Sequence, residues 1–199
     1  VINKPEGLLS VPGRGIEKLD SASHRFHTLF PSSPEQCYVH RLDMDTSGLL
    51  IMAFNKEAHK KLSLAFEKRE VEKTYVALLE GVIKENSGII NLPMRLDVEN
   101  RPYQIVDFEQ GKEAITRWEK LHVTWIGDDK FTRVRFYPET GRTHQLRVHA
   151  ASGLNHPIKG DRLYGNRKEG ERLCLHAESI SFNHPITEER MTFTYPPEF

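Results

Sequence analysis

The 199-residue sequence has few cysteines, no long apolar run and no net charge. Its two cysteines, Cys37 and Cys174, lie far apart and belong to no C-x-x-C motif, which favours a reducing compartment over a disulfide framework. No segment reaches the roughly 18 apolar residues of a transmembrane helix, and no signal-type apolar region is present. We therefore expect a cytoplasmic protein without a membrane partner.

The absence of net charge argues against a uniformly basic nucleic-acid-binding surface, because the 28 basic and 28 acidic residues cancel. Distribution matters more than the sum. Arginines and lysines gather between Arg133 and Arg172, whereas acidic residues cluster upstream, between Asp97 and Glu113. A locally polarised surface is one interpretation of this pattern, and a solvated mixed surface is the other.

Motifs for metals and nucleotides are also missing. His144 and His149 are five residues apart, a spacing that does not place two ligands on one helical face, and there is no H-E-x-x-H motif or Cys/His cluster. The phosphate-binding patterns G-x-G-x-x-G and G-x-x-x-x-G-K-[ST] and the G-x-S-x-G elbow do not occur. We therefore expect neither a metal nor a nucleotide cofactor.

The most informative stretch is 38-YVHRLDMDTSGLLIMA-53, in which charged side chains directly precede an apolar run. The run from Leu49 is typical of a strand covered on both faces. Arg41 and Asp43 would then lie at the end of a rigid core element, which is a suitable place for catalytic groups. Taken alone, an aspartate beside threonine and serine more often caps the turn, and Asp45 is expected on the surface.

Local patterns predict the remaining elements. Asn55 is a good N-cap for a helix whose apolar residues recur at helical spacing. Together the patterns indicate an α+β protein, expected to be a single domain over residues 1–199 whose start resembles a strand trimmed at its N-terminus. The predicted elements are a loop at 8–15, helices at 17–31, 56–69 and 143–152, and strands at 49–53, 73–81, 115–124, 131–137, 179–182 and 191–195.

Three further polar segments stand out: Lys73 with Tyr75, 141-GRTHQLRVH-149 and 156-HPIKGDRLYG-165. Each has an ordinary structural interpretation. Tyr75 is typical of a half-buried packing residue with its hydroxyl at the rim. Arg147 lies three residues from His144, so the two share a helical face and could form a solvated pair.

Taken together and in order, five blocks resemble the RluA-type RNA pseudouridine synthases: 3-NKPEGLLSVPG-13, 40-HRLDMDTSGLL-50, 73-KTY-75, 141-GRTHQLRVH-149 and 156-HPIKGDRLYG-165. The resemblance implies the pseudouridine synthase fold, with a central mixed, largely antiparallel sheet, flanking helices and a catalytic cleft. It also implies isomerisation of uridine to pseudouridine in structured RNA without cofactor, metal or energy source. The implied substrates are stem-loops of 23S ribosomal RNA, the transfer-RNA anticodon stem-loop, or both.

The resemblance implies roles for four residues. Asp43 is the nucleophile or general catalyst, Tyr75 lies against the flipped base, Arg147 pairs with Asp43, and Arg41 rearranges when RNA binds. The chemistry suits these residue types, because a carboxylate can capture an electron-poor sugar or attack the pyrimidine ring. A neighbouring guanidinium would keep that carboxylate ionised.

We expect a monomer whose RNA recognition rests on the catalytic domain, without an S4-like RNA-binding domain. Flipping a uridine out of a helix costs a few kcal/mol and less in a loop, which favours a stem-loop substrate. The residues expected to bind RNA are Arg41, Arg142, His144, Leu146, Arg162 and Lys168.

Two other functions would account for part of this pattern. A non-catalytic RNA-binding or RNA-chaperone module on the same fold would need the basic surface, but it would not need Asp43, Tyr75 and Arg147 together. A carboxylate-dependent hydrolase would need a second catalytic carboxylate at a fixed separation, and no motif supplies one.

Overall fold

The computed structural model describes residues 1–13 and 15–199, so Arg14 in the predicted loop 8–15 lies outside the described residues. The chain forms two compact units. The first comprises Val1–Lys73 and His176–Glu198, and the second comprises Thr74–Leu175 with Phe199. A single domain over the whole chain stays a prediction, and the two units are described separately below.

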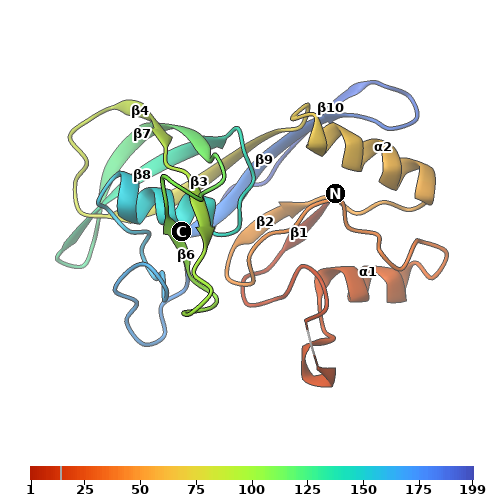
Figure 1. The fold of residues 1–199 in the computed structure, drawn as a ribbon, viewed down its shortest axis with the longest axis horizontal. Coiled ribbons are helices and arrows are strands. Elements are labelled where there is room, and N and C mark those ends of the chain that lie inside the picture. The colour runs from red at the N-terminus through yellow and green to blue at the C-terminus, as the bar shows by residue number, and fades with distance from the viewer. Residues whose placement is uncertain (14) are drawn as a thin grey trace. The chain divides into compact units, whose positions relative to one another are not determined.

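The strands of the first unit form a mixed arrangement (Figure 1). β2 pairs antiparallel with β1 and parallel with β9, and β10 pairs antiparallel with β9. Gly48 is required in β2, because a Cβ atom there would lie 2.4 Å from the Ala177 carbonyl oxygen of β9. The elements are β1 (Ile2–Lys4), η1 (Ile16–Lys18), α1 (Ala22–Leu29), β2 (Ser47–Leu50), α2 (Lys56–Glu67), β9 (Leu175–Asn183) and β10 (Arg190–Thr194).

Side-chain caps set the starts of both α-helices in this unit. The Asn55 side chain accepts a hydrogen bond from the Ala58 N–H (2.8 Å), which confirms the predicted cap of α2. The Ser21 side chain caps α1 in the same way. The predicted helix 17–31 is therefore wrong at its start, since a 3-10 turn and a break precede Ala22. The predicted strand 49–53 is shifted, because β2 begins at Ser47 and ends at Leu50.

The core of the first unit forms where α2 packs on the strands. The helix contributes Ala58 and Leu62, with Ala65 and Phe66 at its margin, and these residues are the apolar stripe predicted from sequence. They meet buried side chains that lie on β2, directly after it and on β9: Leu49, Ile51, Ala53, Ile180 and Phe182. This packing anchors the segment that carries the charged residues of the HRLD block.

The second unit is built on four antiparallel strands in the order β3-β8-β7-β4. The predicted hairpin of β7 and β8 is confirmed, as is β3. The core includes the fully buried Leu79, Val134 and Phe136. The elements are β3 (Glu72–Glu80), β4 (Ser87–Asn91), β5 (Met94–Leu96), β6 (Gln104–Val106), β7 (Ile115–Ile126), β8 (Asp129–Pro138), α3 (Gln145–Val148) and η2 (His149–Gly153).

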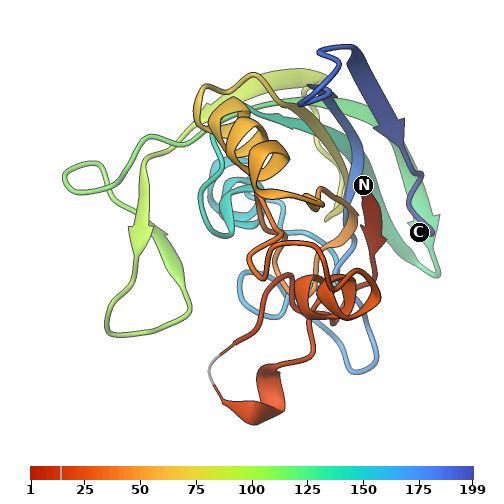
Figure 2. The same cartoon turned by 90° about the vertical axis from the view of Figure 1, so that its right-hand side faces the viewer.

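Strands β4, β5 and β6 were not predicted. β5 and β6 form a separate two-stranded sheet, and Figure 2 shows this hairpin, in green, projecting from the strands of its unit. The predicted helix 143–152 is a short α-helix continued by a π-helical turn, and it starts later because His144 has a left-handed backbone (φ 55°). None of the helices in the described part of the chain has the length and apolar character of a membrane span.

Candidate active site

The loop that carries Asp43 is held by a buried lysine of the first unit. Lys4 is completely buried, and its Nζ donates hydrogen bonds to the carbonyl oxygens of Pro5 (2.8 Å), Leu8 (2.7 Å) and Met44 (3.0 Å). Because Met44 directly follows Asp43, the ammonium group fixes the main chain beside the half-buried carboxylate.

Electrostatics around Lys4 act in two directions. Desolvation lowers the pKa of Lys4 to about 8, while the negative charges of Asp45 and Asp43 oppose this shift. Asp45 was expected on the surface, but it is half-buried and belongs to the electrostatic environment of Lys4. Lys4 therefore supplies a positive charge that interacts electrostatically with the carboxylates of Asp43 and Asp45.

Ser10 fixes the main chain on the other side of Asp43. Its Oγ donates to the Leu42 carbonyl oxygen (2.7 Å) and accepts from the Leu42 N–H (3.0 Å). The Asp43 carbonyl oxygen also accepts from the Thr46 N–H (3.1 Å). Hydrogen bonds to residues 42, 43 and 44 therefore define the backbone at the candidate nucleophile.

His40 fastens the start of this loop to the strand segment. Its Nε2 accepts a hydrogen bond from the Ile51 N–H (3.0 Å), and its ring stacks on Phe66 at 4.5 Å. Desolvation, together with the positive charge of Lys73, lowers the pKa of His40 to about 3. The imidazole is therefore neutral near pH 7, as the accepting nitrogen requires. Arg41 is exposed beside it.

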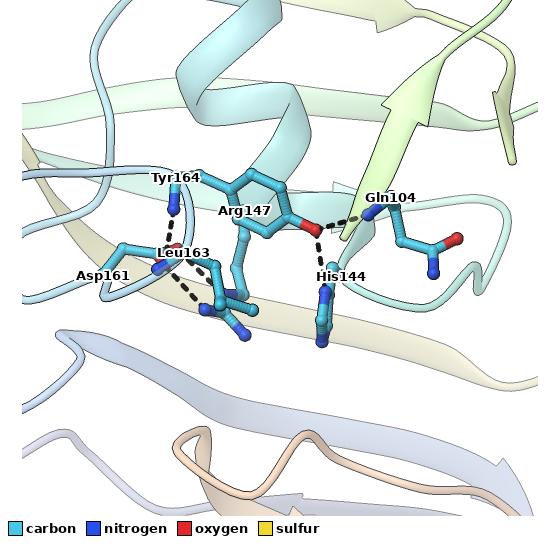
Figure 3. A network of polar contacts seen from close by, with 6 residues as sticks. All are labelled: Gln104, His144, Arg147, Asp161, Leu163 and Tyr164. Atoms are coloured by element: carbon cyan, nitrogen blue, oxygen red, sulfur yellow. Dashed lines mark hydrogen bonds and ion pairs between the residues drawn. The ribbon is translucent and has the colours of Figure 1, made fainter. Parts of the chain in front are cut away.

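In the second unit, Arg147 forms a buried ion pair with Asp161 (Figure 3). The Arg147 Nε donates to Asp161 Oδ2 (2.8 Å) and Nη2 donates to Oδ1 (2.6 Å), and the two side chains are 3% and 0% exposed. This is the bidentate geometry in which a guanidinium fits a carboxylate best. The interpretation of Arg147 as a solvated residue is therefore wrong.

Asp161 is satisfied from both sides. Its Oδ1 also accepts from the backbone N–H groups of Leu163 (2.8 Å) and Tyr164 (3.1 Å). Burial acts to raise the pKa of Asp161, but the hydrogen bond and charge of Arg147 with these two N–H groups outweigh it and hold the pKa below its usual value. Asp161 is thus an ionised anchor for Arg147.

Sequence reasoning missed Asp161 as a site residue. The signal was present in 156-HPIKGDRLYG-165, where an aspartate follows a glycine in a block that carries the family resemblance. The predicted partner of Arg147 was Asp43, which belongs to the other unit, and that pairing stays a prediction. What the structure shows is a charge partner within the same unit.

Tyr164 extends this polar network (Figure 3). Its hydroxyl accepts a hydrogen bond from the Gln104 N–H (2.8 Å) and forms another with His144 Nδ1 (2.8 Å). The Arg147 guanidinium lies over its ring, with Cζ 5.3 Å from the centroid. The predicted residues His144 and Arg147 are therefore joined through a tyrosine that the sequence did not single out.

Tyr75 and the predicted RNA-binding residues differ in solvent exposure and in their contacts. Tyr75 is half-buried on β3, where it packs against the core, as expected of its ring. Leu146 is buried in the same core. Arg142 and Arg162 are exposed, and Arg142 Nε donates to the Glu113 carbonyl oxygen. Lys168 forms an exposed ion pair with Asp129.

The basic segment of the second unit is interleaved with acidic residues. Lys159 pairs with Glu171, and Arg135 pairs with Glu119. The acidic partners offset part of the positive charge of this segment. Among residues 1–13 and 15–199, no group of His, Cys, Asp and Glu side chains could hold a metal ion.

An open cavity of about 470 Å³ lies beside Tyr164 in the second unit. Aromatic and aliphatic side chains form most of its wall, and the polar residues are few. The lining residues are Leu92, Tyr103, Gln104, Ile105, Val106, Phe108, Ser152 and Tyr164.

Comparison with known proteins places the chain in a family. The family model for RNA pseudouridylate synthase matches residues 1–152. This chain belongs to the RNA pseudouridylate synthase family. It is therefore an isomerase that makes pseudouridine in RNA, and neither a non-catalytic RNA-binding module nor a carboxylate-dependent hydrolase is supported.

Curated relatives match along the full chain. The dual-specificity RNA pseudouridine synthase RluA of Pasteurella multocida is 46% identical, and the match covers 100% of this chain and 89% of the relative. The protein of the same name from Escherichia coli is 44% identical with the same coverage. These relatives confirm the resemblance drawn from the five sequence blocks.

Among solved structures, human RNA pseudouridylate synthase domain containing 1 is similar over 100% of this chain and 80% of its own, with a TM-score of 0.81 and 32% identity. Human RNA pseudouridylate synthase domain containing 4 has a TM-score of 0.74 and 24% identity, over 99% of this chain and 85% of its own. The predicted α+β pseudouridine synthase fold is therefore confirmed.

Proposed function

We propose that this enzyme isomerises uridines in stem-loops of 23S ribosomal RNA and in the transfer-RNA anticodon stem-loop, with Asp43 as the catalytic carboxylate. The relatives at 43–46% identity are named dual-specificity enzymes, which supports action on two kinds of RNA. The observation that carries the role of Asp43 is its rigid setting, since Lys4 and Ser10 fix the main chain on both sides of it.

The proposed chemistry begins at Asp43. Its carboxylate either bonds to the sugar carbon as the bond from the base to the sugar breaks, or adds to the pyrimidine ring before that bond breaks. In both routes the uracil turns and rejoins the sugar through its C5 atom, the hydrogen on C5 leaves as a proton, and N1 gains a proton. The bond between the carboxylate and the substrate breaks, so the enzyme carboxylate is released unchanged. The residue that starts the reaction is therefore regenerated in each turnover.

Arg147 is proposed to supply positive charge next to Asp43. Its bidentate pair with Asp161 supports this role, because a guanidinium held by a buried partner keeps one orientation through the reaction. Tyr75 is proposed to provide the surface on which the detached uracil turns, since its ring is half-buried and rests on a rigid strand.

RNA binding is proposed to use side chains that differ in exposure. Arg41, Arg142 and Arg162 are exposed, which suits phosphate contacts. The pair of Lys168 with Asp129 is long (3.4 Å) and solvated, so Lys168 can exchange this partner for a phosphate. His144 and Leu146 are proposed to shape the site near Arg147.

We propose that the enzyme acts as a monomer in the cytoplasm and needs no cofactor. Both cysteines are buried free thiols, which is consistent with a reducing compartment. The reaction is an isomerisation, so it consumes no oxidant, reductant or nucleotide.

The test is to incubate the protein with two separate substrates, a 23S ribosomal RNA fragment and a transfer RNA, each made without modification. New pseudouridines are mapped by carbodiimide-dependent reverse-transcription stops. We expect one site in a loop of each RNA. Modification of only one RNA class would contradict dual specificity, and modification of neither would contradict the proposed substrates.

A further inference from the structure

The orientation of Arg147 is defined by two different contacts. Asp161 holds the edge of the guanidinium through two hydrogen bonds. The ring of Tyr164 lies against the guanidinium, at a centroid distance of 5.3 Å that is within the range of a cation–π interaction (Figure 3). Asp161 therefore fixes where the group is, and the ring opposes its rotation about the axis of the ion pair.

The Tyr164 ring is fixed in turn by its hydroxyl. Hydrogen bonds to the Gln104 N–H and to His144 Nδ1, each 2.8 Å long, hold the hydroxyl from two directions. The His144 ring also meets the Tyr164 ring edge-on, with centroids 5.6 Å apart. His144 occupies a left-handed backbone conformation (φ 55°) that is uncommon for a residue other than glycine. Such local strain is retained when the surrounding contacts determine it.

The hydrogen bond from Gln104 connects this arrangement to the β5–β6 hairpin. Gln104 is the first residue of β6, and its N–H points to Tyr164 while the strand pairs with β5. The backbone of the hairpin, the Tyr164 hydroxyl and the Arg147 guanidinium thus form one continuous series of contacts within the second unit.

We propose that Tyr164 is a positioning residue of the pseudouridine synthase site, which orients the Arg147 guanidinium and couples that orientation to the β5–β6 hairpin. The proposal rests on the proposed function, because it takes Arg147 to act in catalysis. Displacing a catalytic group by about 1 Å can lower a rate by about 100-fold, so a residue that only supports Arg147 can have a large effect.

Two substitutions separate the hydroxyl from the ring. Tyr164→Phe keeps the ring against Arg147 and removes both hydrogen bonds, whereas Tyr164→Leu removes the ring as well. Tyr103→Phe is the matched control. Its ring lies 5.8 Å from that of Tyr164, and its hydroxyl makes no hydrogen bond with residues 1–13 and 15–199.

The measurements are the single-turnover rate of tritium release from RNA containing 5-tritiated uridine, the Kd for that RNA, and the Tm. For Tyr164→Phe we expect a rate about tenfold lower, with Kd within about twofold and Tm within about 3 °C of wild type. For Tyr164→Leu we expect a loss of about 100-fold. The Tyr103→Phe variant should match the wild type in all three.

Other results would overturn the proposal. A purely structural role would lower the Tm of Tyr164→Phe and leave the rate of the folded fraction unchanged. A role in RNA binding would raise the Kd and leave the saturated rate unchanged. An active wild type with an equally active Tyr164→Phe variant would contradict this inference alone, whereas an inactive wild type would contradict the proposed function.

The link to the hairpin is tested with Gln104→Pro, which removes the N–H that Tyr164 accepts. If both changes act through the same hydrogen bond, the double variant with Tyr164→Phe should be no slower than the slower single variant. Rate losses that multiply would overturn the link. If Gln104→Pro lowers the Tm, the link is tested instead by hydrogen exchange of the Gln104 backbone N–H in the Tyr164→Phe variant. Exchange faster than in the wild type supports the link, and unchanged exchange overturns it.

Discussion

The Asp43 loop of the first unit and the Arg147 ion pair of the second unit are stabilised in different ways. In the first unit, Lys4 and Ser10 bind main-chain atoms around Asp43. In the second unit, Asp161 binds the charged end of Arg147 itself. The Asp43 loop should therefore tolerate a change of side chain at the catalytic position, while the Arg147 site should not. A change of the Asp43 side chain should therefore lower activity without lowering stability, whereas a change of the Arg147 side chain should lower both.

The largest effect is expected at the buried ion pair. Arg147→Met leaves the Asp161 carboxylate without its partner in a buried site, so the free energy of unfolding should fall by about 3–5 kcal/mol and activity should be lost. Urea unfolding measures the first effect. Arg117→Met is the control, because its pair with Glu139 is exposed and should contribute less than about 1 kcal/mol. Equal losses in the two variants would contradict the coupling.

A smaller effect is expected at Lys4. Lys4→Met removes three donors and leaves the carbonyl groups of Pro5, Leu8 and Met44 without the ammonium, so we expect a loss of about 2–3 kcal/mol. Tritium release should also slow, because the backbone beside Asp43 loses an anchor. Lys61→Met, on an exposed face of α2, should change neither quantity. A Lys4→Met variant with wild-type stability and rate would show that the loop is held by other contacts.

The pH dependence of stability should report on both units. Desolvation lowers the pKa of His40 to about 3 in the first unit and that of His149 to about 4 in the second, both below the usual value of about 6.5. Between pH 6.5 and 4 the unfolded chain therefore binds more protons, so the free energy of unfolding should fall as the pH falls. Each histidine should contribute a slope of up to about 1.4 kcal/mol per pH unit.

Asparagine substitutions separate the two contributions. His40→Asn and His149→Asn should each reduce the slope of the free energy of unfolding against pH by up to about 1.4 kcal/mol per pH unit, which corresponds to one proton. Urea unfolding at several pH values measures this slope. A variant that keeps the wild-type slope would show that its histidine does not titrate in this range. Below pH 4, Asp161 will also contribute to the pH dependence. Its pKa is lowered in the folded protein, so its carboxylate stabilises the fold above the usual carboxyl pKa. This stabilisation is lost as the pH falls through the lowered pKa of the folded state.

Elements with local signals were predictable from sequence. The Asn55 cap and the stripe of α2 depend on neighbours a few residues away, and the β7–β8 hairpin shows its alternation and its turn. Strands β4, β5 and β6 are only three to five residues long. β4 pairs with β7 across more than twenty residues, so its partner is not visible in a local window.

The candidate site was predictable in its residue types and incompletely in its contacts. The resemblance singled out Asp43, Tyr75 and Arg147, but Asp161 is paired through tertiary contact rather than spacing. Lys4 was overlooked because lysine is rarely buried, and only the fold reveals the three carbonyl groups that make this possible. The left-handed backbone of His144 and its hydrogen bond with Tyr164 were likewise hidden, since the bond joins residues twenty positions apart.

Asp43→Asn is the most direct test of the claim that activity can be lost at Asp43 without loss of stability. Its effects are measured by urea unfolding and by tritium release from 5-tritiated RNA. Asp45→Asn, two residues along the same loop, is the control. For Asp43→Asn we expect a free energy of unfolding within about 1 kcal/mol of wild type and a rate at least about 1,000-fold lower. The control should keep its rate within severalfold of wild type. A stable Asp43→Asn variant that releases tritium near the wild-type rate would contradict the account.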